Sequence, residues 1–312
     1  MNKLIQKRET VRLMGTVIDL LVEHESPEPI MSEVINRLKE YEHRFSANDP
    51  SSELMAVNRH AGICPVTVHP ELYELIQIGK RHSCAPGSYL NIAIGPLVQT
   101  WRIGFADAKV PSEPIIKALL KKIDPHKIML NDKEKSVYLS EKGMSIDLGA
   151  LAKGYIADLV IQYLKSEGVA SALINLGGNV VGLGPSQTSK KKYWTIGIQN
   201  PNLDREHYLT TLKIKNQSVV TSGIYERSLV NKGKAYHHIL SPHTGRPIET
   251  EVASLTIRSD RSVDGEIWST RLYGQSADEI ITELNRVEGI EGLVITKDEQ
   301  LCYSKGLEKI NG

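Results

Sequence analysis

The spacing of hydrophobic and polar residues predicts helices and strands that follow one another without a regular repeat. An apolar run predicts a first strand over residues 16–23, and Ile30, Val34, Leu38 and Tyr41 predict a helix over 29–45. Helical spacing recurs at 54–57, 70–81, 111–123, 148–163, 266–273 and 276–286. Short apolar runs predict further strands at 128–130, 137–139, 144–146, 172–176, 193–199, 209–215, 218–221, 237–240 and 254–257.

This order of elements favours an α+β fold, with mixed and antiparallel sheets, over a doubly wound parallel sheet, because no clean alternation of strand and helix is present. There is no internal repeat of 20 to 50 residues, and no linker rich in proline or serine divides the chain. We therefore expect one domain over residues 1–312, with room for two packed subdomains but no linker between them.

Charge and cysteine content exclude several classes of protein. Lys and Arg number 38 against 37 Asp and Glu, so the net charge of +1 offers no general attraction for nucleic acid. The cysteines, at 64, 84 and 302, lie far apart and form neither a disulfide framework nor a zinc motif. No window reaches the roughly 20 apolar residues of a membrane span, and the first 15 residues contain no signal-peptide core. We expect no nucleic-acid partner, no membrane insertion and a cytoplasmic location.

Two neighbouring segments carry groups suited to phosphate. Gly177-Gly178-Asn179 follows an apolar strand, and such a turn exposes backbone N–H groups to a closely approaching ligand. Asp147 and Lys153 flank the start of a predicted helix, where the helix dipole favours an anion. The same residues also fit a tight turn, a helix cap and a solvated lysine. Neither the Rossmann nor the P-loop motif is present.

Oxygen ligands for a hard cation are spaced along one predicted helix. Glu266 and Thr270 are four residues apart and would share a helix face, with Ser269 beside them. Mg²⁺ prefers one or two carboxylates completed by carbonyls, waters and substrate phosphates. A polar helix face would show the same pattern, so a magnesium site is one of two interpretations.

Residues 237–247 concentrate three histidines, two hydroxyls and an arginine in a segment stiffened by proline and glycine. The histidine spacing and the lack of a fourth soft ligand argue against a zinc centre. A histidine held in a rigid loop is suited to act as a general base. An ordinary surface loop is the alternative.

Taken in order, these segments resemble one family, the ApbE-type FAD:protein FMN transferases. The two most specific matches are Asp147-Leu-Gly-Ala-Leu-Ala-Lys-Gly-Tyr155 and His238-Ile-Leu-Ser-Pro with Thr244-Gly-Arg-Pro247. The further matches are Met14-Gly-Thr16, Phe45-Ser46 with Ser52-Glu53 and Asn58, Gly95-Pro-Leu97 with Trp101, Asn175-Leu-Gly-Gly-Asn179, Thr221-Ser-Gly223 and Ser269-Thr270.

The resemblance implies an ApbE-like, T-fold-like architecture and an Mg²⁺-dependent enzyme that moves FMN from FAD to a threonine hydroxyl of a target flavoprotein, releasing AMP. It places His238 near the reacting phosphate. The implied metal ligands are the backbone carbonyl of Ala150, the side chain of Glu266, and Ser269 and Thr270. The implied flavin and nucleotide contacts are Met14, Asn48, Tyr89, Leu90, Asn91, Asp147, Lys153 and Ile239.

Three positions depart from the family pattern, which commonly has Asp at 266, Tyr at 48 and Asp at 91. Glu266 is longer by one methylene and can still reach a cation, but with less preference for small Mg²⁺. Asn48 offers no aromatic surface for stacking, and Asn91 removes a negative charge near the ligand. Two other readings stay open from the sequence: a metal-dependent FAD pyrophosphatase giving FMN and AMP, and a flavin-binding protein without turnover.

Overall fold

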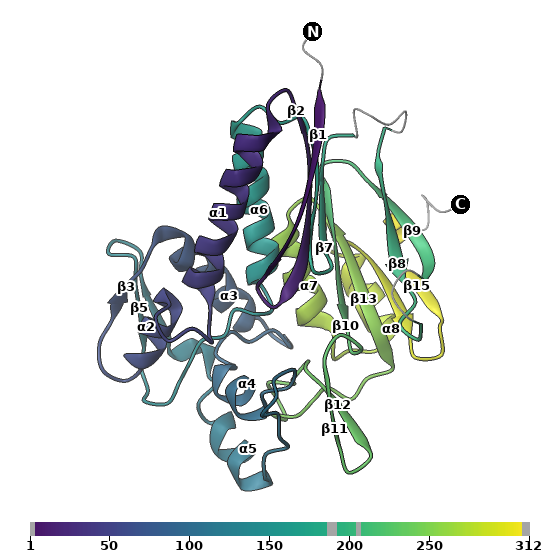
Figure 1. Ribbon diagram of the computed structural model, residues 1–312. Helices are drawn as coiled ribbons and strands as arrows, with labels where there is room; N and C mark the ends of the chain where they lie inside the picture. Colours follow the sequence, from purple (N-terminus) through teal and green to yellow (C-terminus); the bar gives the residue numbers. More distant parts are fainter. Residues whose placement is uncertain (1–3, 186–191, 204–206, 308–312) are drawn as a thin grey trace.

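The computed structural model describes residues 4–185, 192–203 and 207–307 (Figure 1). The helices are α1 (Pro27–Phe45), α2 (Glu53–Arg59), α3 (Pro70–Ser83), α4 (Gly95–Trp101), α5 (Glu113–Leu120), the 3₁₀ turn η1 (Pro125–Lys127), α6 (Ala152–Ser166), α7 (Ser262–Leu272) and α8 (Ala277–Leu284). The strands are β1 (Ile5–Leu13), β2 (Thr16–His24), β3 (Val66–Thr67), β4 (Ile128–Asn131), β5 (Ser136–Leu139), β6 (Ser171–Leu176), β7 (Asn179–Leu183), β8 (Trp194–Gln199), β9 (Tyr208–Ile214), β10 (Gln217–Gly223), β11 (Ser228–Asn231), β12 (Lys234–His237), β13 (Val252–Ser259), β14 (Glu291–Thr296) and β15 (Leu301–Tyr303).

Eight strands form the main sheet in the order β1-β2-β6-β7-β10-β13-β14-β15. Every neighbouring pair in it is antiparallel. Three small sheets, β3-β5-β4, β8-β9 and β11-β12, complete the described strands. The expected α+β class is thereby confirmed, with the sheet built from antiparallel neighbours rather than from parallel strands joined by crossover helices.

The strands of the main sheet direct alternate apolar side chains to its two faces, so both faces must be covered. Helices α1, α3 and α6 cover one of them. In β6, Ala172, Ile174 and Leu176 point into the cluster formed with α1, α3 and α6, whereas Leu173 packs on the opposite side. That opposite side is covered by the hairpin β8-β9, through residues such as Ile196 and Leu212. Figure 1 shows α1, α6 and α7 on one side of the sheet and β8-β9 on the other.

The outermost strand of this sheet, β1, was absent from the sequence-based expectation. Its sequence, IQKRETVRL, alternates charged and short apolar residues and contains no apolar run. β1 nevertheless pairs along its full length with β2, from Ile5 opposite His24 to Leu13 opposite Thr16. Charged side chains on an edge strand also prevent further strands from adding to the sheet. The charged residues that leave β1 without an apolar run are therefore suited to a strand at the edge of the sheet.

Several expected elements differ from the structure at their boundaries. The helix expected at 266–273 begins four residues earlier, as α7, and the helix expected at 111–123 is shorter, as α5. The helix expected from Leu148 begins at Ala152, because the carbonyl of Leu148 accepts from the N–H groups of Leu151 and Ala152 in a preceding turn. Residues 144–146 form only an isolated bridge, between Ser145 and Ile94. The strand expected at 237–240 lies earlier, as β12, so His238 follows the strand instead of lying within it.

Helices α6 and α7 touch closely, and this contact positions the functional residues. A Cβ on Gly154 of α6 would lie 2.6 Å from the carbonyl oxygen of Ser262 and 2.8 Å from Cγ of Glu266. Asp158, one turn further along α6, accepts hydrogen bonds from the N–H groups of Ser262 (2.7 Å) and Val263 (3.0 Å). The first turn of α7 is therefore capped by a side chain from α6.

We expect Asp158→Ala to lower the free energy of unfolding by about 2 kcal/mol, because two N–H groups of α7 lose a charged acceptor. Ser276→Ala is the matched control: Ser276 caps α8 through a capping box, and its loss should cost about 1 kcal/mol. Denaturant unfolding measures both changes. If Asp158→Ala unfolds at the same denaturant concentration as the unmodified protein, the capping role is wrong.

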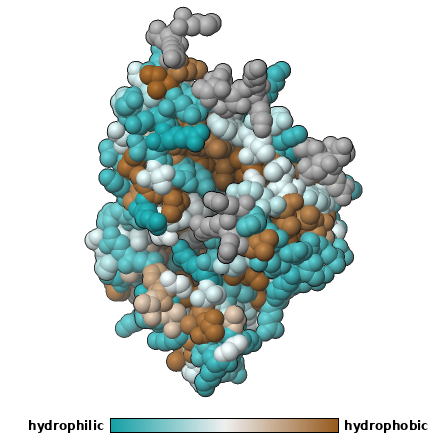
Figure 2. Space-filling view, turned by 45° about the vertical axis from the view of Figure 1, so that its right-hand side comes forward, coloured by the Kyte–Doolittle hydropathy of each residue, from teal (hydrophilic) through white to brown (hydrophobic). Residues whose placement is uncertain are grey.

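The described surface is mixed in polarity. Large hydrophobic residues with high exposure, such as Ile63 and Val230, belong to different parts of the chain. On the face shown in Figure 2, hydrophobic residues form several separate groups among hydrophilic ones. Among the described helices, none is long and apolar enough to cross a membrane.

Candidate active site

The candidate site lies at one end of the main sheet, where two turns meet beside strand β10. The β1-β2 turn holds Met14 and Gly15, both with positive φ, and the N–H of Met14 donates to Oε1 of Glu42 on α1 (2.5 Å). The β6-β7 turn holds Gly177 and Gly178. A Cβ on Gly177 would lie 2.2 Å from Oγ1 of Thr16, so the two turns are in contact. The strand β10 runs beside them, since its Val220 pairs with Asn179.

The Gly177-Gly178 turn has the backbone that its sequence requires. Both residues have positive φ, at 60° and 99°, where a side chain is strained. The N–H of Gly178 donates to Oδ1 of Asn175 at 2.9 Å, which fixes the turn. The tight-turn reading is therefore correct, and it is compatible with a ligand approaching the backbone closely.

Lys153 lies in the first turn of α6 and links this turn to α7. Its Nζ donates to the carbonyl oxygen of Gly177 at 3.5 Å and lies 4.0 Å from Oε1 of Glu266. Asp147 precedes the helix, and its Oδ1 accepts from the N–H of Gly149 at 2.8 Å. Burial raises the pKa of Asp147, and this hydrogen bond opposes the rise. Asp147 therefore caps the turn before α6 and not the helix itself.

Glu266 is a carboxylate buried between α6, α7 and β7. It is 5% exposed, and its Oε1 accepts from Nδ2 of Asn179 at 2.9 Å. Burial raises its pKa, whereas Lys153, Asn179 and the N–H of Gly154 lower it. Such a carboxylate is costly in an apolar interior unless a cation or donors face it. Glu266 is therefore suited to hold a positive ion.

The other two residues expected as ligands on α7 differ in what they contact. Ser269 is fully buried, and its Oγ donates to the carbonyl of Glu266 (3.2 Å) and accepts from Oγ of Ser222 on β10 (2.9 Å). Thr270 is half-buried, one turn after Glu266. No cluster of three His, Cys, Asp or Glu side chains suited to a metal occurs among the described residues. Any cation here would use one carboxylate with hydroxyl and carbonyl oxygens.

His238 directly follows the hairpin β11-β12 and is held at its base. Its backbone N–H donates to the carbonyl oxygen of Arg227 at 3.2 Å, and its Nδ1 lies 3.3 Å from the same oxygen. A carbonyl can only accept, so we assign the hydrogen to Nδ1, which leaves the lone pair on Nε2. Burial lowers the pKa of His238 to about 4, with Arg227 and Lys153 adding positive charge nearby. The imidazole is neutral at pH 7.

The neighbouring histidine, His237, has a different role. Its Nε2 lies 2.8 Å from the carbonyl oxygen of Ile248, which ties the end of β12 to the following loop. A second hydrogen bond joins the same two segments, because the carbonyl of Ile239 accepts from the N–H of Ile248 at 3.0 Å. The fully buried Trp101 of α4 donates from Nε1 to the carbonyl oxygen of Gly245 at 2.8 Å. The loop that carries His238 is therefore fixed from two sides.

The remaining expected contacts make hydrogen bonds within the protein and none with Lys153 or Glu266. Asn48 is exposed, and its Oδ1 accepts from Nε2 of Gln99 at 3.2 Å. Asn91 is buried, with Nδ2 donating to the carbonyl of Ile123 and Oδ1 accepting from the N–H of Ala93, both at 2.8 Å. Leu90 is buried and apolar. Both ends of the Asn91 amide are thus hydrogen-bonded to the protein backbone.

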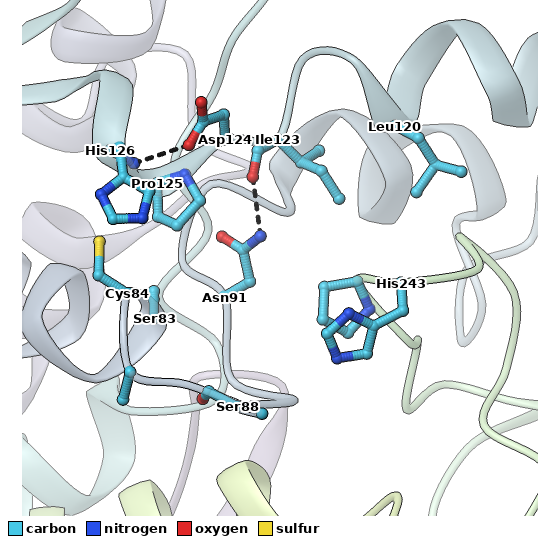
Figure 3. Close-up of a pocket in the computed structure, with 13 residues that line it drawn as sticks. Ser83, Cys84, Ser88, Asn91, Leu120, Ile123, Asp124, Pro125, His126 and His243 are labelled. Atoms are coloured by element: carbon cyan, nitrogen blue, oxygen red, sulfur yellow. Dashed lines mark hydrogen bonds between the residues drawn. The ribbon is translucent and has the colours of Figure 1, made fainter.

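A pocket of about 330 Å³ lies beside this segment (Figure 3). Asn91 and Ser88 line one wall, and His243, from the loop after His238, faces them across the space. His243 also packs edge-on against the ring of Tyr89, with ring centroids 5.0 Å apart. The remaining lining residues are Ser83, Cys84, Ala85, Gly87, Leu120, Ile123, Asp124, Pro125, His126 and Pro242. The pocket therefore joins the 89–91 segment to the loop of His238.

Sequence reasoning assigned no role to three residues that organise this site. The sequence indicates Asn179 only as a member of a turn and of a family motif, and it does not distinguish Asp158 or Arg227 from other polar residues. Asn179 contacts Glu266, 87 residues away, and Asp158 contacts Ser262 across 104 residues. Arg227 acts through its backbone carbonyl. Spacing along the chain gives no signal for contacts of these kinds.

Comparisons with known proteins match nearly the whole chain. A model of the ApbE family matches residues 14–294. An FAD:protein FMN transferase of Klebsiella pneumoniae (strain 342) is 42% identical over 292 residues, which is 94% of this chain and 90% of that protein. An FAD:protein FMN transferase of Treponema pallidum (strain Nichols) is 34% identical over 288 residues, covering 89% of this chain and 80% of that protein.

Solved structures show the same architecture. The ApbE protein of Thermotoga maritima superimposes with a TM-score of 0.90 at 26% identity and covers 98% of this chain and 99% of its own. A flavin transferase ApbE of Vibrio cholerae superimposes with a TM-score of 0.85 at 22% identity, with the same coverage, and supports the fold alone. Both likenesses extend over nearly the whole length of each chain.

Proposed function

Since the chain belongs to the ApbE family, we propose that it is an FAD:protein FMN transferase that moves FMN from FAD to a threonine hydroxyl of a target flavoprotein and releases AMP. The observation that carries this proposal is His238, a neutral imidazole whose Nδ1 faces a carbonyl and whose Nε2 is left as a base. The relatives named for this activity support the flavin substrate. The threonine acceptor and AMP release are parts of the proposal.

Mg²⁺ fits the donors present in the site. Glu266 supplies a buried carboxylate and Thr270, one turn later on α7, a half-buried hydroxyl, and the family resemblance adds the backbone carbonyl of Ala150. Hard cations prefer such oxygen ligands. Ser269 is a weaker candidate, because its hydroxyl is already hydrogen-bonded to two protein groups. When bound, Mg²⁺ supplies positive charge to the pyrophosphate oxygens and polarises the phosphorus.

The protein's own residues perform the positioning that phosphoryl transfer requires. Gly178 leaves the backbone of its turn open to the pyrophosphate, and Lys153 brings its ammonium group to the same turn. His238 takes the proton of the incoming threonine hydroxyl on Nε2. The threonine oxygen forms a bond to the FMN phosphorus, the bond from that phosphorus to the bridging oxygen breaks, and AMP leaves.

The three thiols of the chain agree with a cytoplasmic enzyme. Cys64, Cys84 and Cys302 are all free, and Cys64 is exposed. Exposed free thiols persist where the medium is reducing. We therefore propose an acceptor flavoprotein that meets this enzyme in the cytoplasm.

The proposal is tested by incubating the protein with FAD, Mg²⁺ and a candidate acceptor flavoprotein, following AMP by chromatography and the acceptor by intact mass. We expect AMP together with an acceptor heavier by one FMN moiety. AMP with free FMN, and no adduct on any acceptor tried, would show an FAD pyrophosphatase instead. If FAD binds but no AMP forms, the chain is a flavin-binding protein without turnover.

Trp101→Phe should slow this reaction, because it removes the indole donor that holds the carbonyl of Gly245 in the loop after His238. We expect a loss of roughly tenfold or more in rate from misplacement of the loop. Trp194→Phe is the control, since its Nε1 donates in the same way to the carbonyl of Gly184 on the far face of the sheet. Both variants should lose about 1–3 kcal/mol of stability. Equal transfer rates in the two variants would exclude this role for Trp101.

A further inference from the structure

Asn179 lies at the first position of β7, directly after the two glycines. Its backbone is fixed on both sides, by pairing with Leu176 of β6 and with Val220 of β10. The residue is 1% exposed, and its Nδ2 donates to Oε1 of Glu266 at 2.9 Å. The side chain is therefore attached to a rigid part of the sheet and directed at one atom of α7.

The orientation of this amide is set by Glu266. The Oδ1 of Asn179 is buried and has no hydrogen-bond partner. Turning the amide over would place Oδ1, an acceptor, against the carboxylate, which also only accepts. An unpaired buried oxygen is costly, and native structures usually avoid it. In this orientation Oδ1 stays unpaired, but Nδ2 can donate to the carboxylate of Glu266. Buried groups left in such an unfavourable state are more typical of functional sites than of ordinary packing.

The carboxylate of Glu266 is also confined by α6. Lys153 lies 4.0 Å from Oε1, the same oxygen that Asn179 contacts. Gly154 lacks the side chain that would collide with Cγ of Glu266 at 2.8 Å. The space left by Gly154 accepts the methylene by which glutamate exceeds aspartate. The longer side chain thus has little freedom of its own, and Asn179 selects the rotation of its carboxylate.

We infer that Asn179 is a positioning residue that orients the carboxylate of Glu266 for a divalent cation and thereby raises the affinity of the site for that cation. This inference rests on the proposed function, in which Glu266 is a metal ligand. Partners that hold a ligating carboxylate by a hydrogen bond commonly contribute 10- to 100-fold in metal affinity. Asn179 acts through Glu266 and needs no contact with FAD or with the acceptor.

The test uses Mn²⁺ as the probe, bound to the full-length protein without FAD and followed by the electron paramagnetic resonance signal of the free ion. Asn179→Leu keeps the branched shape of the side chain, with the same number of heavy atoms, and removes both polar amide atoms. We expect it to weaken Mn²⁺ binding about 10- to 100-fold. The matched control is Asn200→Leu, because Asn200 is also buried and donates from Nδ2 to a glutamate, Glu299, at 3.3 Å. That variant should bind Mn²⁺ like the unmodified protein.

Thermal melting establishes that each variant is folded, and Asn179→Ser replaces Asn179→Leu if the latter is not. Three results would overturn the inference: unchanged Mn²⁺ affinity in the Asn179 variant, an equal loss in Asn200→Leu, or no Mn²⁺ binding by the unmodified protein. AMP release and acceptor mass, measured separately on the unmodified protein, report on the transferase proposal. The inference about Asn179 can therefore fail while the proposed function holds.

Discussion

His238→Ala lowers the rate of FMN transfer by about 10²- to 10⁴-fold, the range expected when a general base is removed. The reason is geometric: Nδ1 faces the carbonyl of Arg227, so only Nε2 is available to accept the threonine proton. The affinity for FAD should change much less, because the proton-accepting role belongs to the transition state. Acceptor mass under single-turnover conditions gives the rate, and quenching of flavin fluorescence gives the affinity.

His60→Ala is the matched control for this variant. His60 also has Nδ1 close to a backbone carbonyl, that of Ala56 at 2.8 Å, but it follows α2 and lies outside the site. Its replacement should leave the transfer rate unchanged. If His238→Ala retains full transfer to an acceptor, His238 is not the base.

The same residue predicts how the enzyme depends on pH. Burial lowers the pKa of His238 to about 4, below the value near 6.5 of an exposed histidine. The transfer rate should therefore stay constant from neutral pH downward and fall as the pH approaches 4. The unfolded chain takes up a proton on this histidine between about pH 6.5 and 4, whereas the folded chain does not. His238 thus contributes stability that is lost as the pH falls through this window, and the His238→Ala variant lacks that part of the loss.

Glu266→Gln should affect activity and stability in opposite directions. The amide keeps the shape of the side chain but removes the charge, so we expect transfer in Mg²⁺ to fall roughly 10²- to 10³-fold, equivalent to several kcal/mol of lost stabilisation. In the metal-free protein the same change should raise the melting temperature, because burial already disfavours the charged form of this carboxyl. Rate measurements in Mg²⁺ and thermal melting in a chelator give the two results.

Glu23→Gln provides the comparison for Glu266. Glu23 is 1% exposed, and its Oε1 accepts from a side-chain amide, Nε2 of Gln6, at 2.9 Å. It lies on β2, far along the strand from the turns of the site. We expect no change in transfer rate. A Glu266→Gln variant with the rate of Glu23→Gln would remove Glu266 from the proposed metal site.

The elements that could be predicted from the sequence are those in which the spacing of apolar residues within the segment itself indicates a helix or a strand. α1 and α3 bury one apolar stripe each, and β6 buries alternate residues, so their periodicity is visible in isolation. β1 is charged because it forms the sheet edge, and α4 begins with Gly95-Pro96 and is only seven residues long. The conformation of both is decided by neighbours distant in the sequence, which local patterns do not report.

The candidate site divides in the same way. Lys153, Glu266 and the Gly177-Gly178 turn were identified from their residue types, and the structure brings them together. For Asn91 the motif implies a ligand contact, which stays a prediction, and the structure adds that its amide is hydrogen-bonded to Ile123 and Ala93. Asn179 shows the converse, because its partner is 87 residues away. Motifs indicate which residues take part, and only the fold tells how each is used.

The contact of Lys153, Asn179 and Glu266 also has a consequence for biosynthesis. Because chains fold from the N-terminus as they leave the ribosome, the carboxylate reaches its neighbours only after α7 has emerged and packed on α6. A nascent or truncated chain that ends before residue 266 lacks this group entirely. Such fragments cannot complete the proposed metal site, because its carboxylate is missing.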